Sequence, residues 1–331
     1  MSAKVFLWTK IDKIIGEGKI IIDAHTHIGR DQTATKGRAL YGKFLIEMVE
    51  HYAPGWKMPP PEEMGQGIPV EQYIKECDEA GVDKFVNLAY ANKTPNSEWI
   101  EMATPQNNDF VAKMQKEHPD KVIGFGNVNP WYGKRAVNEV ERCINELDLK
   151  GIKIYPDYDY YRPDNRELCW PMYDKIQDLG VPIMVHQSFT TTVEAPLEYS
   201  HPIQLDAVAR EFRQMKIIVA HFGCPWVETT MALIGKNRNV FADTSFWTSL
   251  EGLTGRPGNE QILRTLLRAP GYKCPHENIF WGTDIKVPIK ESLAQFRGLN
   301  DLAEQIGLPK IPEKAMQGML GDNLAKLLGL I

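Results

Sequence analysis

The chain has 331 residues, 43% hydrophobic and 24% charged, which is ordinary globular usage and excludes wholesale disorder. Thirty-eight basic residues stand against 43 acidic ones, a net charge of −5, and no run of lysine and arginine that could follow a phosphate backbone is present, so nucleic acid is not an expected partner. The length fits one (β/α)8 barrel, typically about 250 residues, with insertions, and we expect a single domain over residues 1–331.

Short apolar runs rich in valine, isoleucine and phenylalanine alternate with longer segments of helical apolar spacing, a pattern typical of βα units around a parallel sheet. The predicted strands are 19–25, 84–90, 122–127, 151–155, 181–186, 216–221, 240–245 and 278–284. The predicted helices are 71–80, 108–117, 134–147, 169–179, 202–214, 261–268 and 288–306, with a further helix at 312–328 outside or beneath the barrel. Eight units favour a closed TIM barrel over an open doubly wound sheet, whose G-x-G-x-x-G loop is missing after the first strand.

Residues 29–67 form a long irregular insertion after the first strand, in which Pro54 and the prolines at 59–61 interrupt any extended helix or strand. Loops that follow barrel strands commonly shape the mouth of an active site. We therefore expect this insertion to border the functional face.

The five cysteines are far apart and form no C-x-x-C pair, which favours reduced thiols. The first ten residues do not resemble a signal peptide, and no apolar run reaches the roughly 18 residues of a membrane helix. These features predict a cytoplasmic protein without a membrane partner.

Two histidines stand two residues apart at the end of the first predicted strand, in the segment Asp23-Ala24-His25-Thr26-His27. Residues two apart on a strand face the same side, so both imidazoles can point at one position, and Asp23 shares their parity. Such a pair is by itself as typical of a structural or surface role as of a metal site.

Three further polar residues end later strands: His186, His221 and Asp284. The carboxyl ends of all barrel strands meet at one face, where barrel active sites are built. Each residue also has a structural alternative, a hydrogen-bonded core histidine or, for Asp284, a helix N-cap. Together they indicate a site for a divalent metal, with Zn²⁺ the first expectation and Mn²⁺, Fe²⁺ or Co²⁺ as alternatives.

Lys153 alternates with Ile152 and Ile154 on the fourth predicted strand, so it enters the barrel if those isoleucines face the outer helices. A buried ammonium group needs a partner. The alternatives are an ion pair with Asp23 or Asp284, a substrate carboxylate, a carboxylate adduct that bridges two metals, and plain structural pairing.

The chain resembles the amidohydrolase superfamily, in particular the amidohydrolase-2 branch of aminocarboxymuconate-semialdehyde decarboxylase-like, metal-dependent hydrolases. Beyond the metal residues, the resemblance rests on the segments 151–156, 220–223, 282–284 and 321–328 and runs from about Ile20 to Leu330. It implies that His25, His27, His186 and Asp284 hold one metal. His221 would then be an active-site histidine or a ligand of a second metal, and Lys153 stands where members with two metals carry a carboxylated lysine.

These residues predict a hydrolase that acts on a small, carboxylated or aromatic molecule through metal-activated water, with Asp284 and His221 as catalytic groups. The alternative is a non-oxidative, metal-dependent decarboxylase of an aromatic or unsaturated acid. Side chains near strand ends that could contact the substrate are Arg30, Tyr155, Tyr158, Arg162 and Trp247. The resemblance also suggests a homodimer.

Overall fold

A computed structural model describes residues 19–29, 68–90, 105–190, 195–247, 258–284 and 288–331. Only Gly29 of the predicted insertion is among them. The rest of the insertion, including Arg30, lies outside the described residues.

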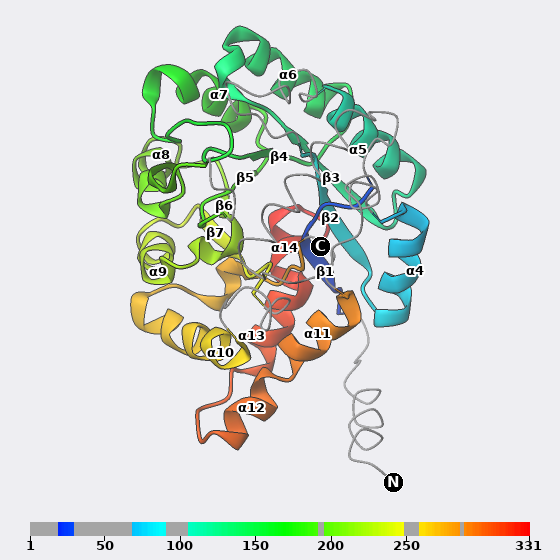
Figure 1. Ribbon diagram of the computed structural model, residues 1–331, viewed down its shortest axis with the longest axis vertical. Coiled ribbons are helices and arrows are strands. Elements are labelled where there is room, and N and C mark those ends of the chain that lie inside the picture. Colours follow the sequence, from blue (N-terminus) through cyan, green and yellow to red (C-terminus); the bar gives the residue numbers. More distant parts are fainter. Residues whose placement is uncertain (1–18, 30–67, 91–104, 191–194, 248–257, 285–287) are drawn as a thin grey trace, which may run out of the picture.

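Eight parallel strands follow one another around a single sheet in chain order. They are β1 (Ile22–Thr26), β2 (Lys84–Leu88), β3 (Val122–Asn127), β4 (Gly151–Ile154), β5 (Ile183–Val185), β6 (Ile217–Val219), β7 (Val240–Asp243) and β8 (Ile279–Phe280). The segment after β8 returns to β1, where Ala24 N donates to Trp281 O at 3.0 Å and Asp284 N donates to His25 O at 2.7 Å. These bonds bring the ring nearly to closure, which confirms the predicted barrel (Figure 1).

Helices surround the strands in the ring that Figure 1 shows. They are α4 (Val70–Ala80), α5 (Pro105–Glu117), α6 (Lys134–Asn145), α7 (Arg166–Asp178), α8 (Leu205–Glu211), α9 (Val227–Lys236), α10 (Asn259–Arg268) and α11 (Ile289–Arg297). A further helix, α12 (Leu299–Gln305), lies outside this ring, beyond α10 and α11. Each amphipathic segment buries one stripe, as α6 does with Ala136, Val140 and Cys143. The single helix predicted over 288–306 is divided in two at Gly298.

The strands separate two apolar layers. In β6, Ile217 and Val219 pack outward with the helices, whereas Ile218 belongs to the cluster inside the barrel. This alternation follows from the period of two along a strand. The polar side chains of His25, His221 and Asp243 lie at the carboxyl ends of the strands, beyond these apolar layers.

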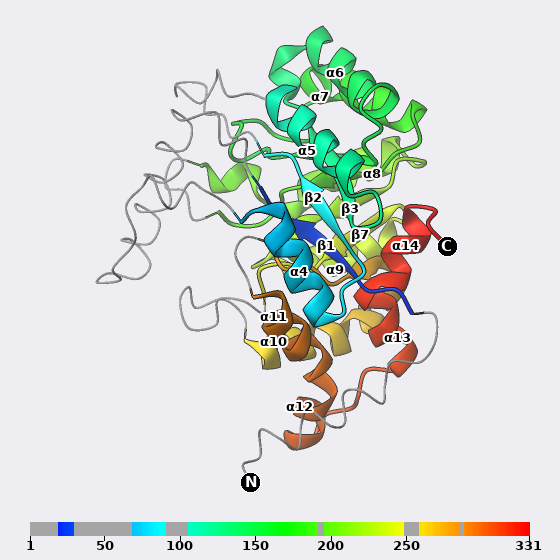
Figure 2. The same cartoon turned by 90° about the vertical axis from the view of Figure 1, so that its right-hand side faces the viewer.

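The predicted C-terminal helix is an α-helix, a π-helical turn and a second α-helix: α13 (Glu313–Gln317), Gly318–Asp322 and α14 (Asn323–Leu327). Leu324, Ala325 and Leu327 join the interior apolar cluster. Side-chain amides of Gln317 and Asn323 donate to carbonyls at the starts of β1 and β8. The segment therefore lies beneath the barrel, by the start of β1 in Figure 2.

Gly321 lies against the backbone just before β1, and a Cβ there would stand 2.1 Å from Ile20 O. Relieving this clash would require one of the two backbone segments to move. Gly321→Ala is therefore expected to lower the free energy of unfolding by about 2 kcal/mol or more. Gly271→Ala is the matched control, since a Cβ there meets open space. Equal melting temperatures for the two variants would contradict this packing.

Among the described helices, none has the length and apolar character needed to cross a bilayer.

Candidate metal centre

His25, His27 and Asp284 meet where β1 and the segment after β8 end. His25 Nε2 lies 3.3 Å from His27 Nε2 and 3.9 Å from Asp284 Oδ1, and His27 Nε2 lies 3.6 Å from Asp284 Oδ1. The side chains are nearly buried, Asp284 being the most open at 11% exposure. Within the described ranges, these residues form one of two groups whose donor atoms all lie within 4.8 Å of one another.

Asp23 does not lie in this cluster, although it shares the parity of His25 and His27 in the sequence. A register shift between Asp23 and Thr26 interrupts the period of two, and the Asp23 carboxylate accepts hydrogen bonds from Tyr73 Oη at 3.0 Å and Thr283 N at 2.9 Å. It also accepts from His25 N at 3.1 Å. Asp23 therefore joins the ends of β1 and β8 and holds the backbone of His25 beside that of Asp284.

His221 follows β6 in a left-handed conformation, with φ of 56°. Its ring centroid lies 4.8 Å from that of His25 and 4.9 Å from that of His186, and its Nδ1 lies 3.9 Å from Asp284 Oδ2. Burial and the neighbouring His25 and His186 rings lower the pKa of His221 well below its usual value, which favours the neutral imidazole.

His186 follows β5 and reaches the cluster through His221: His186 Nδ1 lies 3.2 Å from His221 Nε2. Its Nε2 lies 3.5 Å from Asp157 Oδ2, and burial raises the pKa of Asp157 to about 7. Neither three-residue group within the described part of the chain includes His186. Its role as a metal ligand stays a prediction.

Sequence reasoning missed Asp243, which ends β7. Its Oδ2 lies 3.1 Å from His25 Nδ1, the ring nitrogen that faces away from His27. Asp243 is fully buried. The predicted strand runs on to residue 245, so Asp243 does not stand at its end, whereas the observed strand β7 ends at Asp243.

Lys153 enters the barrel, as the outward packing of Ile152 and Ile154 requires. Its Nζ is buried and has no hydrogen-bond partner among the residues that the structure describes. Burial lowers the pKa of Lys153, and the carboxylates of Asp243, Asp284 and Asp157 oppose this effect. An ion pair with Asp23 is not formed, because that carboxylate points toward α4.

Two of the predicted aromatic contacts lie beside the histidines. The Tyr155 ring centroid stands 6.4 Å from that of His27, and the Tyr158 centroid 5.1 Å from that of His186. Trp247 instead supports the site from behind, since its Nε1 donates to His221 O at 2.8 Å. Arg162 is half exposed and pairs with Asp164, so it does not reach the cluster in this structure.

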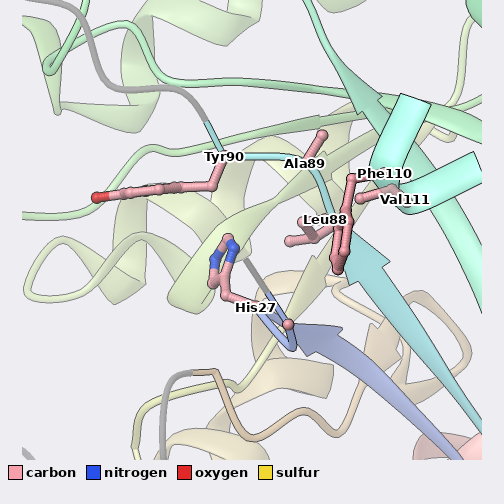
Figure 3. A pocket seen from close by; sticks show the side chains of 7 residues that line it. His27, Leu88, Ala89, Tyr90, Phe110 and Val111 are labelled. Atoms are coloured by element: carbon pink, nitrogen blue, oxygen red, sulfur yellow. The ribbon is translucent and has the colours of Figure 1, made fainter. Parts of the chain in front are cut away.

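A cavity of about 20 Å³ adjoins His27. Its lining residues are His27, Gly29, Leu88, Ala89, Tyr90, Phe110 and Val111 (Figure 3). This volume has room for about one water molecule. The cavity therefore extends the site by a solvent-sized space next to a predicted ligand.

The donor set fits a divalent metal. Two imidazole nitrogens and a carboxylate oxygen converge, and a carboxylate holds the opposite nitrogen of His25, as is typical around metal-bound histidine. Three protein ligands would leave positions for substrate around a bound ion, which is the arrangement of a catalytic site.

Comparisons with known proteins extend this geometry. Over 79 residues the chain is 30% identical to 2-amino-3-carboxymuconate-6-semialdehyde decarboxylase from Dictyostelium discoideum, covering 24% of this chain and 22% of that protein. Over 128 residues it is 23% identical to gamma-resorcylate decarboxylase from a Polaromonas species, covering 35% and 38% of the two chains. The matched segments thus span well under half the length of these relatives.

A solved structure of 5-carboxyvanillate decarboxylase from Novosphingobium aromaticivorans, complexed with manganese and 4-hydroxy-3-methoxy-5-nitrobenzoic acid, has the same fold. The TM-score is 0.67 at 14% identity, covering 94% of this chain and 96% of that one. A family model described as amidohydrolase matches residues 22–330. That match includes every strand of the barrel and the cluster residues His25, His27 and Asp284. This chain therefore belongs to the amidohydrolase-2 family of metal-dependent enzymes.

Proposed function

We propose that this protein is a metal-dependent decarboxylase of a small aromatic or unsaturated carboxylic acid. The observation that carries the proposal is the convergence of His25, His27 and Asp284 at the carboxyl end of the barrel, next to His221. Membership of the amidohydrolase-2 family supports an enzyme at this position.

The relatives favour decarboxylation over the hydrolysis that we first expected from the sequence. Both relatives compared above and the similar structure are named decarboxylases. The two reactions draw on nearly the same set of residues, so the ligand pattern in the sequence does not separate them. The names of these two relatives and of the similar structure therefore favour decarboxylation.

In the proposed reaction, the bond between the substrate carbon and its carboxylate breaks, CO₂ leaves, and the electron pair left on carbon takes a proton. His25, His27 and Asp284 would hold the metal, with His186 as the expected fourth ligand. A bound divalent ion supplies positive charge that orients substrate oxygens and stabilises developing negative charge.

The protein's own residues would manage the proton and orient the substrate. The 3.9 Å between His221 Nδ1 and Asp284 Oδ2 puts two proton-carrying groups side by side at the cluster. The rings of Tyr155 and Tyr158 lie 6.2 Å apart at 75° to each other, so one of them would stack on a flat acid while the other meets its edge. Lys153 offers a buried cation for an anionic group of the substrate.

The identity of the ion is a finer proposal. The imidazole and carboxylate donors favour Zn²⁺ by ligand type, whereas the similar decarboxylase structure holds manganese. We propose that either ion occupies the site, and reconstitution of the metal-free protein with each ion alone compares them by turnover.

Product analysis tests the reaction class. The metal-loaded protein is incubated in D₂O with a panel of aromatic and unsaturated carboxylic acids, and the expected products are CO₂ and a molecule with deuterium at the carbon that lost the carboxylate. A parallel panel of lactones and amides in H₂¹⁸O tests hydrolysis. Incorporation of ¹⁸O into products, with no CO₂ from any acid, would reject decarboxylation.

A further inference from the structure

We propose that Asp243 and Ser245 are positioning residues that fix the tautomers of His25 and His221 through one continuous hydrogen-bonded chain. The proposal rests on the proposed function only in treating His25 as a metal ligand. Its geometry is independent of which reaction the metal assists.

The chain begins at His25. Its Nε2 faces His27 and Asp284, while its Nδ1 lies 3.1 Å from Asp243 Oδ2. An imidazole nitrogen that binds metal carries no proton, so the proton of neutral His25 stands on Nδ1 and is donated to Asp243.

The other oxygen of Asp243 is surrounded by donors. Oδ1 accepts from His221 N at 3.1 Å and Ser245 N at 2.9 Å, and it is in short contact with Ser245 Oγ. Because a carboxylate only accepts, the single hydroxyl proton of Ser245 points to Asp243.

Ser245 Oγ is then left as an acceptor, 2.8 Å from His221 Nδ1. The Ser245 carbonyl oxygen, which can only accept, lies 3.3 Å from the same nitrogen. Two acceptors thus require a proton on His221 Nδ1 and leave Nε2 with a free electron pair. His186 Nδ1, 3.2 Å away, donates to it. In neutral His186 the other nitrogen, Nε2, then carries no proton; it lies 3.5 Å from Asp157 Oδ2.

Asp243 also stands in a second group of candidate metal donors, with His25 and His221. Ser245 Oγ, however, lies within 3.1 Å of both Nδ1 atoms and contacts the carboxylate. The hydroxyl therefore fills the space between these donors, and the contacts form a hydrogen-bond relay rather than a second metal site.

Asp243→Asn is the sharpest test, because the structure fixes how the new amide must lie. Two backbone N–H groups face Oδ1, so the amide oxygen takes that position and the NH₂ group faces His25 Nδ1. That donor forces the His25 proton onto Nε2, the atom needed for metal. We expect the dissociation constant for zinc to rise about 10- to 100-fold.

Ser245→Ala is the matched variant in the same network. It leaves the contact of His25 with Asp243 intact, so zinc affinity is expected to stay within about threefold of the wild type. Zinc competition with a chelator gives the affinities. ¹⁵N NMR of labelled histidine side chains gives the tautomers. If Asp243→Asn acted only by removing a negative charge, the His25 proton would stay on Nδ1.

In the wild-type protein, with zinc and without it, the NMR signals are expected to show His25 and His221 protonated at Nδ1. A proton on Nε2 of either ring would overturn the proposal even if no variant folds. It would equally be overturned if Asp243→Asn kept the His25 proton on Nδ1 and bound zinc like the wild type. Absence of CO₂ release with these tautomers in place would contradict the proposed function alone.

Discussion

Replacing His27 with alanine is expected to release the metal and to lower turnover by about a thousandfold or more. The substitution removes one of three donor atoms that lie within 4.8 Å of one another. A catalytic ion contributes several kcal/mol of transition-state stabilisation, and each 1.4 kcal/mol corresponds to about a factor of ten. Elemental analysis after gel filtration measures bound metal, and kcat/KM with the best acid measures the loss.

His118→Ala is the control for this prediction. His118 lies in the turn between α5 and β3, at the amino-terminal end of the strands and so at the opposite end of the barrel from the cluster. The metal content and turnover of the His118→Ala protein should match those of the wild type. A His27→Ala protein that retains a full equivalent of metal would show that the ion binds elsewhere.

His221→Asn is expected to lower kcat by about a hundredfold or more while the metal stays bound, because His25, His27 and Asp284 are intact. Asparagine is preferred to alanine at this position, since its side chain tolerates the left-handed backbone that His221 adopts. The loss would then report the missing imidazole beside Asp284 rather than a strained turn.

Metal content and kcat of the same His221→Asn preparation separate two roles for this residue. Full metal with low turnover supports a proton-handling imidazole. Loss of metal together with turnover would instead make His221 a ligand, the alternative that the sequence left open.

The alternation of strands and helices predicted the barrel, and the convergence of strand ends predicted that His25, His27 and Asp284 cluster. The strand ends converge because parallel strands deliver their carboxyl ends to one face, so residues far apart such as His25 and Asp284 meet without local sequence evidence. Asp243 was missed because the predicted strand 240–245 ends two residues later than β7 does.

The differences between the sequence expectations and the structure have local physical causes. The β1 register shift breaks the period of two, which turns Asp23 toward Tyr73 and leaves His25 in the cluster. Arg162 bonds to Asp164, two residues along its own loop, and spacing along the sequence does not reveal that preference. Asp157 also reaches His186 from a loop, where no periodicity applies.

The contact between the ends of β1 and β8 has a consequence for biosynthesis. Asp23 and Thr283 stand 260 positions apart, and Gln317 reaches back 297 positions to Ile20. During translation β1 emerges well before β8 and before the helices beneath the barrel, so one edge of β1 must wait unpaired. Because Asp284 follows β8 directly, the metal could be bound only after β8 has paired with β1. Uptake of the metal would therefore report that the barrel has closed.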